Sequence, residues 1–247
     1  MKTDILGVWI DKITPQEALE KALEFSKGNE PHVIFTPNPE FIMTARKDKK
    51  FKDILNAADL LVPDGIGVVL ASKLFNKVKI KYRVTGYDLV QEIFKNISKS
   101  GESVYFLGGA PGVAETAREK MQELHNGLKV VGVSDGYFDE VKEIEIIKEI
   151  IDKKPDILLL GIGFPKQEKW IDKHKNELPV KLHIGIGGAL DGMAGIVPRA
   201  PKFFRKCGLE WLYRLIRQPS RWKRQLQLPL FILVVTKEKI VGLFKRR

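Results

Sequence analysis

Through its first 190 residues the sequence alternates short apolar runs rich in β-branched side chains with longer amphipathic stretches. The apolar runs predict six strands, over residues 32–36, 60–62, 103–107, 129–133, 157–161 and 181–186. The stretches between them predict helices over residues 15–26, 40–57, 86–98, 113–125, 140–153 and 166–175. Uninterrupted apolar strands are typical of a parallel sheet that helices cover on both faces. The sequence therefore predicts an α/β, Rossmann-like fold with a mostly parallel sheet.

The net positive charge of the chain comes from its last fifth. Residues 196–247 carry 14 Lys and Arg against two acids, whereas residues 1–195 carry 28 bases and 29 acids. The helical pattern also becomes basic and aromatic-rich after residue 195, with expected breaks at Pro219 and Pro229. We therefore divide the chain into an α/β core, residues 1–195, and a basic amphipathic appendage of two or three helices, residues 196–247. A cationic segment suits an anionic partner, such as phospholipid, nucleic acid or a diphosphate.

The sequence predicts a cytoplasmic protein that does not cross a membrane. Its first 12 residues lack the charged start and sustained apolar run of a secretory signal. The longest apolar run, residues 230–235, has six residues and is far shorter than a spanning helix. A single cysteine, Cys207, excludes an intramolecular disulfide and fits a reducing compartment.

Five turns follow predicted strands, at residues 36–40, 62–67, 107–112, 161–168 and 185–191, and all but the first contain glycine. Glycines allow backbone N–H groups to approach a phosphate, and the relevant ones are Gly108, Gly109, Gly163 and Gly187. Neither the dinucleotide fingerprint G-x-G-x-x-G nor a Walker A motif occurs. A single turn of this kind more often only connects a strand to a helix and binds no ligand. Five such turns at one edge of a sheet favour a nucleotide or sugar-nucleotide site.

Several polar residues lie in these turns or beside them. Asp64 could take a proton from a hydroxyl as a general base, and capping of a helix starting near Gly65 is an equally weighted alternative. Thr36 and Asn38 offer neutral hydrogen bonds, although caps and Asx-turns are the commoner role of such residues. The remaining candidates, each with an ordinary structural or surface role as its alternative, are Gln167, Arg83 and Asp191.

No metal cofactor is predicted. The four histidines are scattered, and the Asp-x-Asp pair that often holds a metal–diphosphate complex is absent. A diphosphate leaving group would then need arginines, which the appendage supplies at spacings of three and four: Arg214, Arg217, Arg221 and Arg224. Aromatic and apolar residues between them suit a membrane interface. The alternative is a basic helix that packs its apolar side on the core.

Six motifs together resemble the WecG/TagA/CpsF glycosyltransferases, which form glycosyltransferase family 26. They are TPNPEF at 36–41, ADLLVPDGIG at 58–67, FLGG at 106–109, GIGFPKQE at 161–168, GGALD at 187–191 and GLEWLYRLIRQPSRW at 208–222. They occur in the family's order over about residues 4–232. The similarity is greatest to the members that act in wall teichoic acid synthesis.

The resemblance implies an inverting, metal-independent transfer of N-acetylmannosamine from UDP-ManNAc. The acceptor would be the 4-hydroxyl of GlcNAc on undecaprenyl diphosphate, and the product a β-1,4-linked disaccharide lipid made at the inner face of the cell membrane. By motif, Asp64 is the base, with Thr36, Asn38 and Gln167 around the sugar. Arg83 would support the substrate or a phosphate, and Asp191 the nucleoside. The arginines that would close over the diphosphate are Arg214, Arg221 and Arg224.

The alternatives differ in substrate or in class. The same fold could use UDP-ManNAc-uronate or UDP-glucose, because none of the motifs identifies the sugar. A nucleic-acid-binding protein would use the basic tail but would not need the glycine turns. A nucleotide-sugar epimerase or oxidoreductase is disfavoured by the missing dinucleotide fingerprint and the missing Tyr-x-x-x-Lys pair. An exposed apolar face on the appendage could also serve a homo-oligomer instead of lipid.

Overall fold

A computed structural model of the chain describes residues 1–75, 79–217, 219, 222 and 226–244. Its central sheet has six parallel strands in the order β4-β3-β8-β7-β5-β6. Their bounds are β3 His32–Phe35, β4 Leu60–Leu61, β5 Ser103–Gly108, β6 Lys129–Ser134, β7 Ile157–Gly161 and β8 Leu182–Gly185. All six predicted strands are present, and the predicted α/β class with a parallel sheet is confirmed.

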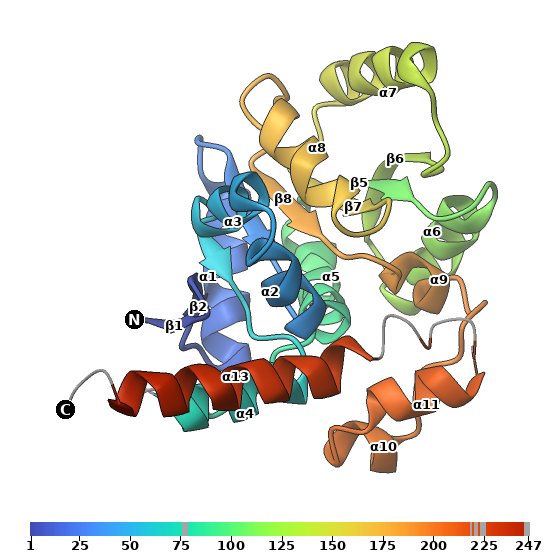
Figure 1. Cartoon of the computed structure of the whole chain (residues 1–247). Coiled ribbons are helices and arrows are strands. Elements are labelled where there is room, and N and C mark those ends of the chain that lie inside the picture. Colours follow the sequence, from blue (N-terminus) through green and yellow to red (C-terminus); the bar gives the residue numbers. More distant parts are fainter. Residues whose placement is uncertain (76–78, 218, 220–221, 223–225, 245–247) are drawn as a thin grey trace.

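Helices cover both faces of the sheet (Figure 1). The helices of residues 1–195 are α1 Pro15–Lys27, α2 Pro39–Ala45, α3 Lys49–Asn56, α4 Ile66–Phe75, α5 Gly86–Ser100, α6 Val113–Leu124, α7 Glu140–Lys153, α8 Lys166–His174 and α9 Ala189–Met193. Neighbouring residues of a strand point to opposite faces, so Leu158 and Leu160 enter the core beneath α7 and α8. Leu159 enters the second core, beneath α1, α5 and α6.

The structure differs from the sequence prediction at two places near the N-terminus. β1 Lys2–Ile5 and β2 Val8–Asp11 form an antiparallel hairpin that the sequence analysis missed. Its turn holds Leu6 and Gly7 at positive φ, and leucine there lacks the Asn-Gly signal of such turns. The helix predicted over residues 40–57 is two helices, because the Asp48 side chain accepts a hydrogen bond from the Phe51 N–H (2.9 Å) and caps α3.

The appendage contains α10 Lys202–Lys206, α11 Glu210–Arg217 and α13 Gln227–Phe244 within the described residues. Pro229 was expected to break a helix, but it falls in the first turn of α13, where the missing N–H costs nothing. The division of the chain at residue 195 stays a prediction.

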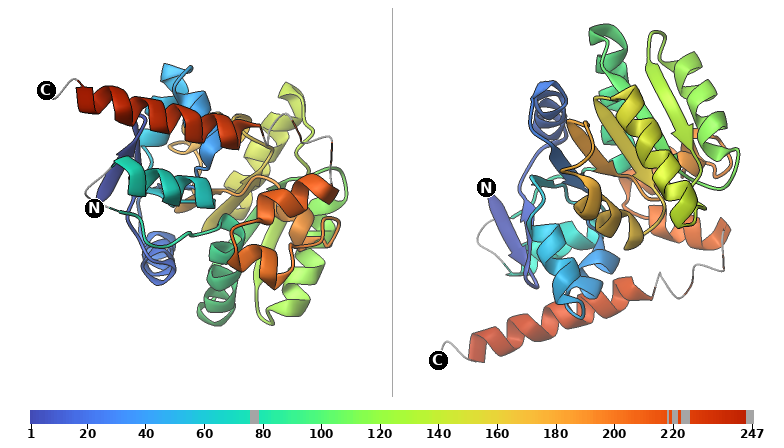
Figure 2. Two further views of the ribbon diagram at one scale, coloured as in Figure 1. Left: turned by 60° about the horizontal axis from the view of Figure 1, so that its bottom comes forward. Right: turned by 90° about the horizontal axis from the view of Figure 1, so that it is seen from above.

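The helix α13 packs on α4 and α2, and Figures 1 and 2 show it lying alongside α4. Phe231 and Val235 are fully buried and belong to the same core as the sheet residues above. Gly67 permits the close approach, because a Cβ there would lie 2.7 Å from side-chain carbons of both Leu228 and Pro39. Part of the appendage therefore packs on the core through α13, whereas the membrane-docking role of the basic segment before it stays a prediction.

Two ion pairs also join the appendage to the core. Glu210 pairs with Arg83 at 3.3 Å, and Glu238 of α13 pairs with Arg46 at 2.9 Å. These glutamates are the only acids of residues 196–247, so each negative charge of the appendage meets an arginine of the core. No helix of the described residues is long and apolar enough to cross a membrane.

Replacing Phe231 with alanine tests the packing of α13. We expect Phe231→Ala to lower the free energy of unfolding by about 3–5 kcal/mol, because it removes a fully buried ring. Leu233→Ala is the matched control on the same helix, since Leu233 is 68% exposed, and it should change stability by less than about 0.5 kcal/mol. Equal stabilities of the two variants in denaturant titrations would contradict this packing.

Candidate active site

Three adjacent strands place the predicted polar residues together. β4, β3 and β8 are neighbours in the sheet, and Asp64, Thr36 and Asp191 follow their carboxyl ends. Parallel strands end at one edge, so segments far apart in the sequence meet there. The predicted site is thus assembled by strand order.

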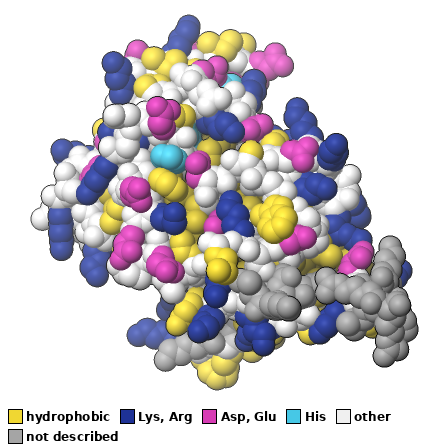
Figure 3. Space-filling model, turned by 90° about the vertical axis from the view of Figure 1, so that its left-hand side faces the viewer, with side chains coloured by type: hydrophobic (Ala, Val, Ile, Leu, Met, Phe, Trp, Pro, Cys, Tyr) yellow, Lys and Arg dark blue, Asp and Glu magenta, His cyan; other side chains and the backbone are white. Residues whose placement is uncertain are grey.

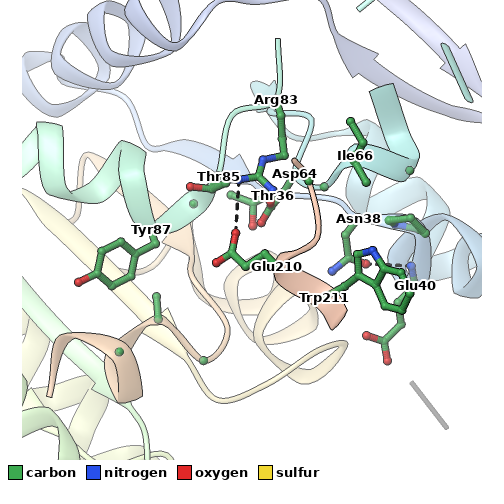
Figure 4. A pocket seen from close by; sticks show the side chains of 18 of the residues that line it. Thr36, Asn38, Glu40, Asp64, Ile66, Arg83, Thr85, Tyr87, Glu210 and Trp211 are labelled. Carbon is green, nitrogen blue, oxygen red and sulfur yellow. Dashed lines mark hydrogen bonds and ion pairs between the residues drawn. The ribbon is translucent and has the colours of Figure 1, made fainter. Parts of the chain in front are cut away.

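A cavity of about 260 Å³ opens at this edge, between core and appendage (Figure 4). Of the predicted site residues, the core contributes Thr36, Asn38, Asp64, Arg83 and Asp191 to its lining. The appendage contributes polar and apolar wall residues, namely Val197, Pro198, Arg199, Gly208, Glu210, Trp211, Gln227 and Leu228. The cavity therefore exists in this shape only while α11 and α13 lie against the core.

Asp64, Thr36 and Arg83 lie close together in the middle of the cavity (Figure 4). The Asp64 N–H donates to the carbonyl of Pro37 at 3.1 Å, which fixes the turn after β4 to the turn after β3. Thr36 is buried, and its hydroxyl donates to the Gly185 carbonyl at 3.5 Å. A half-buried carboxylate and a hydroxyl are thus held side by side by backbone contacts between three strand ends.

Asn38 performs the structural role that was its alternative and also lines the cavity. Its Oδ1 accepts hydrogen bonds from the N–H groups of Glu40 (2.8 Å) and Phe41 (3.3 Å), so it caps α2. The amide nitrogen is the group that it can offer to a ligand. Capping and binding are therefore compatible at this position.

Two arginines line the cavity, and each already meets a carboxylate. Arg83 pairs with Glu210 at 3.3 Å, with both side chains largely buried. Arg199 pairs with Asp88 and lies over the Tyr87 ring, 4.6 Å from its centroid. Both cations are thus held in fixed positions by partners on another segment.

The described lining of the cavity is acidic on balance. It contains four carboxylates and only the two arginines just named, and the carboxylates belong to Glu40, Asp64, Asp191 and Glu210. A diphosphate entering between these groups would meet more negative than positive charge. Further cations are needed before the site favours a diphosphate, whereas neutral sugar hydroxyls suit the carboxylates as they are.

Gln167 does not line the cavity but lies buried beside it. Its Oε1 accepts from the Gly187 N–H at 2.9 Å, and its Nε2 donates to Glu168 Oε1. Gly185 makes room for this amide, because a Cβ there would lie 2.9 Å from Nε2. Gln167 therefore orients the turn after β8, and its predicted place around the sugar stays a prediction.

Glu168 is a fully buried carboxyl that the sequence analysis interpreted only as a helix-start residue. Burial raises its pKa from 4.5 to about 7, against the opposing hydrogen bond from Gln167. Within the described residues its second oxygen has no hydrogen-bond partner. The carboxyl therefore exchanges its proton near neutral pH, one residue away from Gln167.

The other predicted site residues either do not line the cavity or lie outside the residues that the structure describes. Gly108, Gly109, Gly163 and Gly187 are not among the lining residues. Gly108 instead permits contact between strand ends, since a Cβ there would lie 2.4 Å from the Gly161 carbonyl oxygen. The Arg214 backbone lies in α11 but its side chain is outside the described set, as are Arg221 and Arg224 entirely.

Sequence reasoning gave no role to several residues that line the cavity, namely Glu40, Tyr87, Arg199, Glu210 and Trp211. Glu40, Glu210 and Trp211 lie inside the motifs quoted above, so the motifs were the available signal. Tyr87 and Arg199 lie in no motif, and their meeting follows only from the fold.

A sequence model of the WecG/TagA/CpsF glycosyl transferase family matches residues 3–244. The chain belongs to this family. It is a glycosyltransferase, and the match extends across both the core and most of the appendage. Within the described residues of this transferase, no group of three or more His, Cys, Asp or Glu side chains is arranged to hold a metal ion.

Similar proteins carry the name N-acetylglucosaminyldiphosphoundecaprenol N-acetyl-beta-D-mannosaminyltransferase. That of Bacillus subtilis strain 168 is 36% identical over 207 residues, 84% of this chain and 80% of its own. That of Bacillus spizizenii is 35% identical over 211 residues, 85% and 81% of the two chains. That of Staphylococcus aureus strain MRSA252 is 34% identical over 240 residues, 96% and 93% of the two chains.

The buried Glu168 carboxyl makes the stability of this transferase depend on pH. Its raised pKa means that the unfolded chain loses this proton near 4.5 and the folded chain near 7, so ionisation costs stability as pH rises through that window. We expect Glu168→Gln to gain stability relative to wild type between pH 5 and 8, by on the order of 3 kcal/mol at pH 8. Glu123→Gln, on an exposed side chain, should show no such pH-dependent gain in denaturant titrations. If the difference in free energy of unfolding between Glu168→Gln and wild type did not change with pH, the raised pKa of Glu168 would be contradicted.

Proposed function

We propose that this transferase moves N-acetylmannosamine from UDP-ManNAc to the 4-hydroxyl of GlcNAc on undecaprenyl diphosphate, with inversion to a β-1,4 linkage. The observation that carries the proposal is the cavity between core and appendage, with Asp64 at its middle. The names of the relatives support the lipid-linked GlcNAc acceptor and the transferred N-acetylmannosamine. The UDP donor, and wall teichoic acid or a related cell-surface polymer as the product's destination, are what the resemblance to the family implies.

In the proposed reaction Asp64 acts as general base. Its carboxylate takes the proton of the acceptor hydroxyl, whose oxygen attacks the anomeric carbon of the donor sugar from the face opposite UDP. The bond from that carbon to the β-phosphate oxygen breaks, and its electron pair leaves with UDP. A single displacement of this kind inverts the anomeric centre and needs no protein nucleophile. Thr36 and Asn38 line the cavity beside Asp64 and would bind hydroxyls of the reacting sugars.

The departing UDP needs positive charge that the described lining does not supply. Arg83 and Arg199 are both paired with carboxylates. We assign the missing positive charge to Arg214, Arg221 and Arg224. In the sequence these arginines lie in α11 or shortly after it, and two other residues of α11, Glu210 and Trp211, already line the cavity. Arginine donors that meet the charge developing on the phosphate would stabilise the transition state without a metal ion. The nucleoside would lie near Asp191.

The same segment would hold the enzyme on an anionic membrane at the cytoplasmic face, where the lipid-linked acceptor is found. Exposed hydrophobic side chains of the appendage, Phe203, Ile216, Trp222, Leu226 and Leu233 among them, accompany its 14 Lys and Arg residues. In Figure 3 hydrophobic side chains protrude beside Lys and Arg at the lower end of the molecule, where Figure 1 shows α10 and α11. Such a surface suits the interface of an anionic bilayer. A homo-oligomer is a further proposal for this exposed apolar surface.

The donor sugar is the least constrained part of the proposal. UDP-ManNAc-uronate and UDP-glucose differ from UDP-ManNAc only at substituents of the ring. A panel of the three donors, tested by UDP release with one acceptor, separates them. Binding of nucleic acid through the basic tail is the alternative of another class, and it predicts salt-sensitive RNA binding with no thermal stabilisation by UDP.

Replacing Asp64 with asparagine tests the proposed base. We expect Asp64→Asn to lower kcat for transfer by about 10²–10⁴-fold, because the amide cannot accept the hydroxyl proton, while UDP still stabilises the protein thermally. Asp152→Asn, on an exposed residue of α7, is the matched control and should keep full activity. Undiminished transfer by Asp64→Asn would remove Asp64 as the base, and a strict metal requirement after EDTA treatment would contradict the metal-free mechanism.

Neutralising the appendage arginines one at a time tests the charge assignment. Arg214→Gln, Arg221→Gln and Arg224→Gln should each lower kcat/KM, by about 10²-fold where the guanidinium meets the leaving phosphate. Lys202→Gln removes the same charge from an exposed position of α10 and should leave kcat/KM within about twofold. If all three arginine variants matched the Lys202 variant, the leaving-group charge would have to be neutralised by other groups.

A further inference from the structure

The cavity has two chemically different ends, with Asp64 between them. Figure 4 shows Tyr87 at one end and Trp211, Glu40 and Asn38 at the other. A transfer reaction brings two substrates to one base, so a base that lies between two differently lined ends of one cavity implies a subsite on each side. The two ends can be told apart by their side chains.

The Tyr87 end has features that suit the donor. Arg199 lies over the Tyr87 ring, and a Cβ at Gly192 would lie 3.1 Å from that ring, so helix α9, which carries Asp191, borders this end. It therefore offers an aromatic ring with a guanidinium over it, and a carboxylate. Such groups suit a nucleobase and ribose hydroxyls.

The opposite end joins two segments of the appendage to α2. Trp211 comes from α11, Glu40 from the first turn of α2, and Leu228 from α13, where its side chain approaches Pro39 and Gly67. An indole ring presents an apolar face for the C–H groups of a pyranose, and a carboxylate accepts hydrogen bonds from its hydroxyls. Glu40 and Asp64 together disfavour a phosphate here, so a neutral sugar ring fits this end best.

The position of this end also fits a substrate that is tethered to lipid. Gln227 and Leu228 line the cavity, and their neighbours Leu226 and Leu230 are 54% and 43% exposed. A sugar bound beside Trp211 would thus have an apolar exit path next to it, along the appendage. The Tyr87 end also adjoins exposed apolar residues, since Pro198 lines it and Ile196, the neighbour of Val197, is 59% exposed. The choice between the two ends therefore rests on Trp211 and Glu40.

We propose that Trp211 and Glu40 form the subsite for the acceptor N-acetylhexosamine, with the Trp211 indole against the ring and the Glu40 carboxylate on its hydroxyls. This inference rests on the proposed function and adds which side of Asp64 the acceptor occupies. It also makes α11 part of the substrate-binding surface, so acceptor binding and closure of the appendage become one event.

The test is steady-state kinetics with a water-soluble, short-chain lipid-linked GlcNAc acceptor, so that membrane binding plays no part. Trp211→Ala should raise KM for the acceptor by about tenfold or more and leave KM for UDP-ManNAc within about twofold. Trp211→Phe keeps a ring and should recover most of the acceptor affinity, which a folding defect would not do. Glu40→Gln should raise KM for the acceptor severalfold. Trp9→Ala, on a tryptophan of β2 that is 49% exposed and outside the cavity lining, is the control and should leave both constants unchanged.

The outcomes separate the inference from the proposed function. A rise in KM confined to UDP-ManNAc would place the donor at Trp211 and overturn the inference. Unchanged values of both KM constants in Trp211→Ala would overturn it as well. Equal losses of acceptor affinity in Trp211→Ala and Trp9→Ala would do the same. Wild-type protein that binds UDP but transfers no sugar to the acceptor would instead defeat the proposed function.

Discussion

The packing of α13 against α4 and α2 is the contact on which the cavity depends. Phe231 and Val235 anchor the helix in the core, and Gly67 lets it approach closely enough for Leu228 to reach the cavity wall. Glu210 and Glu238, the only acids of the appendage, then meet Arg83 and Arg46 of the core. One wall of the site is thus supplied by a segment that has a strongly positive net charge and several exposed apolar side chains. In the proposed function this arrangement would couple substrate binding to the surface on which the lipid-linked acceptor is found.

The core and the appendage contribute different charged and polar groups to the site. The core contributes mainly carboxylates and hydroxyls to the described lining, groups that suit neutral sugars and proton transfer. The two arginines of the described lining come one from each part, Arg83 from the core and Arg199 from the appendage, and the net charge of the appendage is strongly positive. In the proposed reaction the base belongs to the core, the acceptor sugar lies between Glu40 of the core and Trp211 of the appendage, and the leaving diphosphate meets arginines of the appendage. Neither part alone offers all of these groups.

The sequence predicted the strands well and the site only in part. Periodic apolar runs identify strands, but strand order is a tertiary property, and only the order β4-β3-β8 shows which turns meet. That order brings Thr36, Asp64 and Asp191 together and leaves the turns after β5 and β7 outside the lining. The ion pair of Arg83 with Glu210 spans 127 residues, and no local pattern announces such a contact. The hairpin at Leu6 and Gly7 was missed because its turn residues are unusual.

The most direct test of this account is a crystal structure of the Asp64→Asn enzyme with UDP-ManNAc and a soluble lipid-linked acceptor analogue. The account predicts both sugars in the cavity, one on each side of residue 64, with α11 and α13 packed as they are here and guanidinium groups of the appendage on the diphosphate. A complex with the sugars bound while α11 and α13 lie away from them, or with a metal ion neutralising the phosphates, would contradict it.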